Sequence, residues 1–122
     1  MKTKFLEIDR PTINGRVYPK EVVEKALKLF LERTGREIIP IVSEPKMIPK
    51  LDDIVGFARD VKIEEGYLCG EVEFIDGKIQ SIVSEGEGIC IRPNGVGSIR
   101  NGVVQDDYRL NGFSIVRKKE IV

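Results

Sequence analysis

Histidine and tryptophan are absent from this 122-residue sequence, and cysteine occurs only twice. Without histidine, the chain lacks the one side chain whose unperturbed pKa lies near neutrality. Proton transfer would therefore need a strongly shifted carboxylate, lysine or cysteine. The commonest nitrogen ligand of zinc is missing as well. Cys69 and Cys90 have neither metal-ligand spacing nor the density of a disulfide framework, which predicts reduced thiols in an intracellular setting.

An excess of charge and a long hydrophobic run are also missing. Twenty basic and 20 acidic residues give a formal net charge of zero, whereas nucleic-acid-binding proteins normally carry a basic excess. No apolar stretch approaches the roughly 20 residues that cross a membrane, and Glu7 and Asp9 interrupt any N-terminal signal core. We therefore expect a soluble, cytoplasmic protein without a nucleic-acid or membrane partner, formed by one domain over residues 1–122.

The N-terminal part of the chain predicts a strand, a helix and a second strand. Residues 2–8 form the first expected strand, and helical signals run from Pro19 to Gly35. One apolar stripe at helical spacing supports this helix: Val23, Ala26, Leu27, Phe30 and Leu31. Residues 37–43 predict a strand that Pro40 would place at a sheet edge or next to a bulge.

Two period-two patterns around a short turn predict a hairpin in the middle of the chain. In residues 53–63 the expected common face holds four apolar residues: Val55, Phe57, Val61 and Ile63. In residues 67–74 the expected face holds three: Leu68, Val72 and Phe74.

Short elements with glycine-rich connections are expected after residue 75. In chain order they are a short helix at 77–85, a strand at 88–92, a glycine-rich loop at 93–97, a hairpin turn at Asn101-Gly102 and a last strand at 108–117. The whole pattern predicts an α+β fold: a small bent sheet or barrel of about six or seven strands with one long and one short helix.

The order of these motifs resembles the prohead (capsid maturation) proteases of tailed phages, whose fold is related to herpesvirus assemblin. The resemblance begins with the box Asn14-Gly15-Arg16-Val17-Tyr18-Pro19 that leads into the helix. It continues through the Gly-Glu-Val motif at 70–72, the glycine-rich segment at 88–98 and the closing strand at 108–116. These segments span residues 14–116, and the resemblance implies an assemblin-like fold.

The same resemblance implies a serine nucleophile and two histidines, and this chain departs from all three. Glu44, before Pro45, stands where one histidine is expected, and Asp53 stands where the other precedes Ile-Val. The strand that matches the nucleophile offers Cys90 and Ile91. Arg92 matches an arginine near the oxyanion-stabilising segment, and its alternative is a surface arginine paired with Glu85 or Glu87.

Each of these positions also has a non-catalytic interpretation. Cys90 could be a surviving nucleophile, but neighbouring carboxylates raise the pKa of a thiol, and free cysteines usually fill apolar space. Glu44 and Asp53 could form a carboxylate dyad, or a metal site together with Asp52, although their spacing matches no calcium-loop pattern. The run 95–98 lacks the lysine of a phosphate loop. We therefore expect no cofactor and no metal.

The favoured interpretation is a catalytically degenerate relative of the phage prohead proteases. It would act as a structural or assembly component of a viral capsid: a scaffold, a decoration protein or a partner of an active protease. Capsid or scaffold proteins, or a second copy of the chain, are the expected partners. The expected location is the host cytoplasm, the prohead or the virion. The alternatives are an active maturation protease with Cys90 as nucleophile and a small domain unrelated to capsids.

Overall fold

The computed structural model describes residues 2–12, 14–35, 37–44, 50–75 and 89–117. In chain order the elements are β1 (Lys2–Glu7), α1 (Lys20–Thr34), β2 (Ile38–Val42), the 3-10 turn η1 (Leu51–Asp53), β3 (Ile54–Glu64), β4 (Tyr67–Phe74), β5 (Ile89–Val96), β6 (Ile99–Arg100), β7 (Val103–Val104) and β8 (Arg109–Arg117). This arrangement confirms the α+β class. The short helix expected at 77–85 lies outside the described residues.

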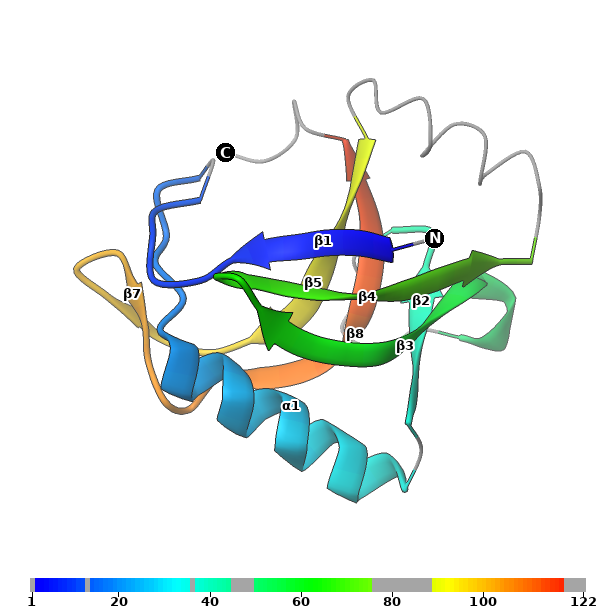
Figure 1. The fold of residues 1–122 in the computed structure, drawn as a ribbon, viewed down its shortest axis with the longest axis horizontal. Coiled ribbons are helices and arrows are strands. Elements are labelled where there is room, and N and C mark those ends of the chain that lie inside the picture. Colours follow the sequence, from blue (N-terminus) through cyan, green and yellow to red (C-terminus); the bar gives the residue numbers. More distant parts are fainter. Residues whose placement is uncertain (1, 13, 36, 45–49, 76–88, 118–122) are drawn as a thin grey trace.

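Six strands form one sheet in the order β1-β4-β3-β2-β8-β5, and β6 and β7 form a separate hairpin. The pair β2–β8 is parallel, and the other neighbouring pairs are antiparallel. The sheet curls into a half-barrel, so its two edge strands, β1 and β5, approach each other (Figure 1). Helix α1 runs beneath the curled sheet in this view.

Helix α1 is built as its sequence pattern predicts. Its stripe buries Val23, Ala26 and Phe30 against the sheet. Gly35 ends the helix in the left-handed conformation, with φ of 64°, and its N–H donates to the Leu31 carbonyl at 3.0 Å. The N-terminal end holds a cap that comes from outside the helix. There, the Asp9 carboxylate accepts a hydrogen bond from the Lys20 N–H at 3.0 Å.

The core lies between α1 and the inner face of the sheet. Ile39, Ile41 and Phe113 are completely buried there. The Phe113 ring stacks on Phe5 with 4.2 Å between the ring centroids, which joins the edge strand β1 to the interior strand β8 at the other side of the sheet. The expected face of β4 is confirmed, because its three apolar residues, Leu68, Val72 and Phe74, are all buried.

The expected face of β3 was wrong at Phe57. Val55, Val61 and Ile63 pack against the core, but Phe57 is 40% exposed and lies on the outer face. Ala58, completely buried, points inward instead. Two register shifts in β3, one between Ile54 and Gly56 and one between Arg59 and Lys62, cause the difference, because each shift resets which residues of an alternating pattern face inward.

Two prolines lie within strands. Pro40 is in the interior strand β2, and the next two residues span a register shift, so the bulge alternative holds and the edge alternative does not. Residues 93–97 were expected to be a loop, but β5 continues through Pro93 to Val96. Strand β5 is a sheet edge, where a proline does not interrupt a ladder on its open side.

The segment that carries the Asn14–Pro19 box packs against the β6–β7 hairpin. The Val17 N–H donates to the Gly102 carbonyl at 2.7 Å, and the Val104 N–H donates to the Val17 carbonyl at 2.9 Å. Tyr18, which is buried, meets the Tyr108 ring edge-to-face at 5.8 Å. The residues of the box that carry the resemblance therefore hold the hairpin in place.

Candidate functional site

Glu44 and Asp53 lie at the same end of the sheet. Glu44 follows the last residue of β2 by two positions and is exposed, and Asp53 immediately precedes β3. The two segments are joined directly, because the Ser43 N–H donates to the Asp53 carbonyl at 2.9 Å. The Asp53 carboxylate also accepts a hydrogen bond from the Lys50 N–H at 2.8 Å. Capping this turn is a structural task for the Asp53 side chain.

Cys90 and Arg92 lie on β5, across β8 from β2. Arg92 pairs with Ser114 of β8, and Ser114 pairs with Val42 of β2. Cys90 is two residues before Arg92 and pairs with Val116. Cys90 therefore lies closer than Arg92 to the end of the sheet at which Glu44 and Asp53 lie. The topology thus brings Glu44, Asp53 and Cys90, the positions predicted from the sequence resemblance, toward one end of the sheet.

The strands themselves keep the thiol apart from the carboxylate segments. Neighbouring strands are about 4.8 Å apart, which places the backbone at Cys90 about 10 Å from β2 and about 14 Å from β3 along the sheet. The Cys90 Sγ lies 3.6 Å from the Val116 carbonyl oxygen, to which its S–H donates. A thiol that donates its proton to the backbone is satisfied in its neutral form.

Ser114 is a residue of this region that the sequence analysis missed. It is 1% exposed, and it is the one buried polar residue among the described parts of the chain. Its position opposite Arg92 and beside Val42 places this serine between β5 and β2. In the sequence, Ser114 interrupts the apolar run of residues 113–116. This interruption is the local feature that points to a buried polar residue in the last strand.

The glycines after Arg92 serve packing. A Cβ atom on Gly95 would lie 2.6 Å from both the Tyr108 hydroxyl and the Arg109 carbonyl oxygen, and one on Gly97 would lie 2.7 Å from the Tyr108 Cα. Burial raises the pKa of Tyr108 far above its usual value, while the positive charge of Arg92 acts in the opposite direction. Gly95 and Gly97 thus make room for the partly buried Tyr108, and this packing explains both glycines without a phosphate site.

One acidic residue accepts a hydrogen bond from the backbone between β5 and β6. The Asp107 carboxylate accepts a hydrogen bond from the Ser98 N–H at 3.0 Å, and this bond lowers the pKa of Asp107. In the described parts of the chain, no cluster of three or more histidine, cysteine, aspartate or glutamate side chains is placed to hold a metal ion. Among the same residues, no helix is long and apolar enough to cross a bilayer.

No protein-family model matches this chain, and no curated protein sequence matches it. Among solved structures, the chain is similar to the capsid assembly protease gp21 of bacteriophage T4. The similarity has a TM-score of 0.71 and covers 96% of this chain and 80% of that chain, at 20% sequence identity. At this identity the likeness shows a shared fold. The protease-like half-barrel expected from the sequence motifs is therefore confirmed as a fold.

Proposed function

We propose that this chain is a non-catalytic relative of the capsid maturation proteases that serves as a structural or assembly component of a viral capsid. It would act as a scaffold, a decoration protein or a partner of an active protease, in the host cytoplasm or within the prohead. The shared fold with the T4 capsid assembly protease supports the capsid context. The chemistry of the family-matching positions supports the loss of catalysis.

One observation carries the proposal. Glu44, Asp53 and Cys90, the positions matched to the catalytic residues of the proteases by the sequence resemblance, lie toward one end of the sheet. The side chains there are two carboxylates and a thiol, in a chain without histidine. The Cys90 S–H donates to the Val116 carbonyl oxygen. The scaffold of a site is thus present without a group suited to remove a proton near neutral pH.

The contacts of Cys90 work against the alternative of an active cysteine protease. A cysteine nucleophile reacts as the thiolate, which a neighbouring cation stabilises. Arg92 is such a cation, two residues from Cys90 on the same strand and the same face. The positions matched to the two histidines carry carboxylates and lie two and three strands away, after β2 and before β3. The Val116 carbonyl oxygen, which accepts the Cys90 S–H, favours the neutral thiol.

A cleavage assay with the purified chain tests the loss of catalysis. We expect a complex mixture of denatured proteins to show no new N-termini by mass spectrometry above the level given by Cys90→Ala. Iodoacetamide should alkylate Cys90 in the folded protein no faster than it alkylates a free thiol. Cys69→Ala is the matched control, because it removes the other cysteine, which is 3% exposed. Turnover that Cys90→Ala abolishes and Cys69→Ala preserves would disprove the proposal.

Co-expression tests the assembly role. The chain is produced together with any capsid and scaffold proteins whose genes lie beside its own, and particles are isolated by sedimentation. We expect the chain to sediment with the particles and the Cys90→Ala variant to do so equally. Particles that form normally and never contain the chain would contradict the capsid assignment.

A further inference from the structure

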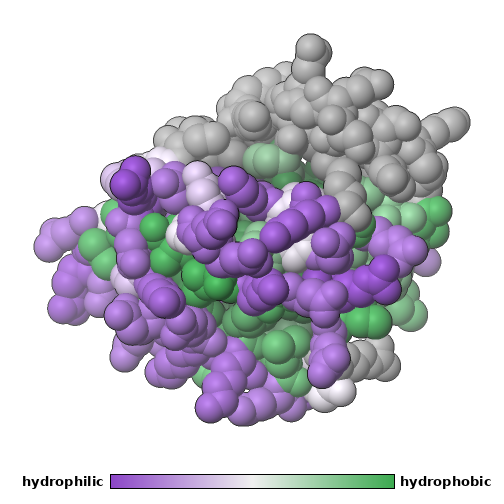
Figure 2. Space-filling view, viewed as in Figure 1, coloured by the Kyte–Doolittle hydropathy of each residue, from purple (hydrophilic) through white to green (hydrophobic). Residues whose placement is uncertain are grey.

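An apolar groove runs along β2 and β3, beside the C-terminal end of α1. Its volume is about 680 Å³. The floor and walls include three apolar side chains of β2 and β3: Ile38, Pro40 and Phe57. Ile38 is 49% exposed and Phe57 is 40% exposed. Hydrophobic side chains reach the surface over the region of β2 and β3, with hydrophilic ones around them (Figure 2).

Two arginines and one glutamate lie along this groove: Arg33, Arg59 and Glu73. Arg33, near the end of α1, is held in place. Its Nη2 donates to the Leu110 carbonyl at 3.0 Å, and its guanidinium carbon lies 5.3 Å from the centre of the Phe30 ring. A guanidinium fixed in this way needs little reorganisation to donate its remaining N–H groups to a carboxylate.

The second arginine is held loosely. Arg59 and Glu73 approach to 3.8 Å, and their side chains are 61% and 74% exposed. An ion pair of this exposure contributes little free energy and exchanges readily. Among the described residues, the charges of the groove sum to +1 (Arg33, Arg59 and Glu73), and Arg33 is the fixed cation. Complementarity calls for a ligand that combines apolar side chains with one negative charge.

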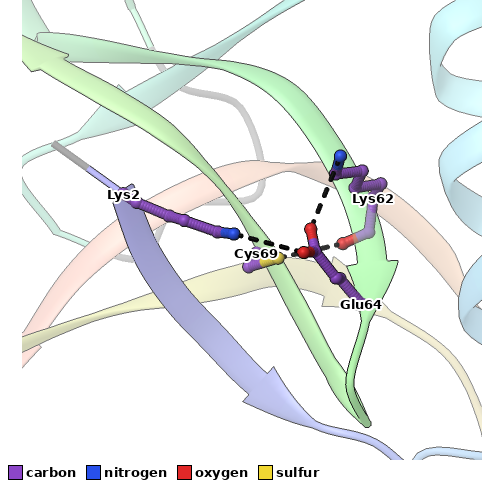
Figure 3. A network of polar contacts seen from close by, with 4 residues as sticks. All are labelled: Lys2, Lys62, Glu64 and Cys69. Atoms are coloured by element: carbon purple, nitrogen blue, oxygen red, sulfur yellow. Dashed lines mark hydrogen bonds and ion pairs between the residues drawn. The ribbon is translucent and has the colours of Figure 1, made fainter.

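On the outer face of the sheet near β1, in contrast, charged side chains cover an apolar residue. Cys69 of β4 is 3% exposed although it does not belong to the core cluster. Lys2 and Lys62 converge on Glu64 beside it (Figure 3). Charged side chains close the surface at that end, whereas Phe57 in the groove stays 40% exposed. The exposed apolar surface of the groove is suited to a partner.

We propose that this groove binds a short segment of a partner protein in which two apolar side chains flank an acidic one. The apolar side chains pack on Ile38 and Phe57, and the carboxylate pairs with Arg33. The inference rests on the proposed assembly role, because that role supplies a partner protein. The binding itself can be measured with the purified chain and requires no particle. A second copy docked groove to groove would oppose the same arginines across its two-fold axis, which disfavours self-association here.

The test is an NMR titration of the ¹⁵N-labelled chain with a panel of short synthetic peptides with blocked ends. Each peptide carries leucine and phenylalanine on either side of one glutamate, and the spacing varies across the panel. A matched panel carries glutamine in place of glutamate. We expect shifts confined to the groove residues and affinity weaker by at least about tenfold for the glutamine peptides, because a charge-assisted pair is lost.

Two variants and two controls sharpen the result. Phe57→Glu should abolish binding, while Ile99→Glu, at 41% exposure on the distant strand β6, should leave it unchanged. Arg33→Glu should reverse the preference toward peptides with lysine in place of glutamate. Arg33→Lys keeps the charge and should bind the glutamate peptides with intermediate affinity, which guards against a folding defect in the first Arg33 variant.

Three outcomes would overturn the inference. The first is that no peptide of the panel shifts the groove residues. The second is equal affinity for glutamate and glutamine peptides. The third is a concentration-dependent dimer, seen by sedimentation, that Phe57→Glu dissociates, since the occupant would then be a second copy. If the peptides fail while the chain still sediments with capsid particles, the groove proposal falls and the assembly role stands.

Discussion

The two faces of the curled sheet are built on different principles. The inner face is filled by apolar side chains of every strand and of α1, and its central residues, Ile39, Ile41 and Phe113, are completely buried. The outer face changes along its length. A lysine and glutamate network covers the part near β1, and the part over β2 and β3 leaves Ile38 and Phe57 exposed.

The difference separates what holds the fold from what is available to a partner. Packing on the inner face connects elements far apart in the sequence, such as β1 and β8 through the rings of Phe5 and Phe113. Changes there should act on stability. The outer face makes few such connections at Phe57, so changes there should act on binding and leave the fold intact.

The largest expected effect compares the same substitution on the two faces. Phe113→Ala removes a completely buried ring that stacks on Phe5, and we expect it to lower the free energy of unfolding by about 3–5 kcal/mol. Phe57→Ala removes a ring that is 40% exposed and should cost less than about 1 kcal/mol. Urea unfolding followed by circular dichroism measures both. Equal losses would show that the outer face also holds the fold together.

The next effect concerns the close contact between β5 and the start of β8. Gly95→Ala would place a Cβ atom 2.6 Å from the Tyr108 hydroxyl and from the Arg109 carbonyl oxygen, and we expect a loss of about 1–3 kcal/mol. The double variant Gly95→Ala/Tyr108→Phe should recover only part of it, because the carbonyl contact remains. The neighbouring exposed Val96→Ala is the control. A fully stable Gly95→Ala would mean that the glycine is not required by packing.

A somewhat smaller effect tests the cap of α1. Asp9→Ala removes the carboxylate that accepts the Lys20 N–H and should cost about 1 kcal/mol, as the loss of an N-terminal cap typically does. Asp9→Asn keeps an acceptor oxygen and should retain most of the stability. Thermal melting of the two variants measures the difference. Identical melting temperatures for Asp9→Ala and the unmodified chain would exclude a capping role.

Much of the inner face could be predicted from the sequence, since it depends on local patterns. Patterns within a few residues were enough to predict the helical stripe around Ala26, the end of the helix at Gly35 and the buried face of β4. The turn at Asn101-Gly102 is equally local, and both residues adopt positive φ. These features are confirmed.

The wrong predictions concern residues whose structure depends on contacts with segments far away in the sequence. Phe57 continues an apparent alternation, but bulges in β3 reset it. Pro93 and Gly95 are typical of a loop, yet the open edge at β5 tolerates the proline and Tyr108 requires the glycine. The cap from Asp9 and the anchoring of Arg33 by Leu110 link residues far apart in the sequence, so no local pattern announces either one.

The smallest expected effect concerns the charged cover near β1 and its dependence on pH. Lys2 Nζ lies 3.4 Å from Glu64 Oε1, and Lys62 Nζ lies 3.4 Å from Oε2 (Figure 3). The hydrogen bond from Lys2, followed by its charge and that of Lys62, lowers the pKa of Glu64 below the ordinary 4.5. The same hydrogen bond raises the pKa of Lys2 above 10.5.

The lowered pKa of Glu64 makes its contribution to stability fully present above pH 4.5, and the contribution disappears as the pH falls through the folded-state pKa. The raised pKa of Lys2 makes its contribution disappear as the pH rises through a value above 10.5. Glu64→Gln should therefore flatten the acid side of the stability profile measured by urea unfolding. The exposed control Glu37→Gln should leave that profile unchanged. Because this network is exposed and screened by salt, the flattening should shrink at high ionic strength. A flattening that persists in high salt would mean that Glu64 acts through buried contacts, and that the covered part of the outer face resembles the inner face more than the groove.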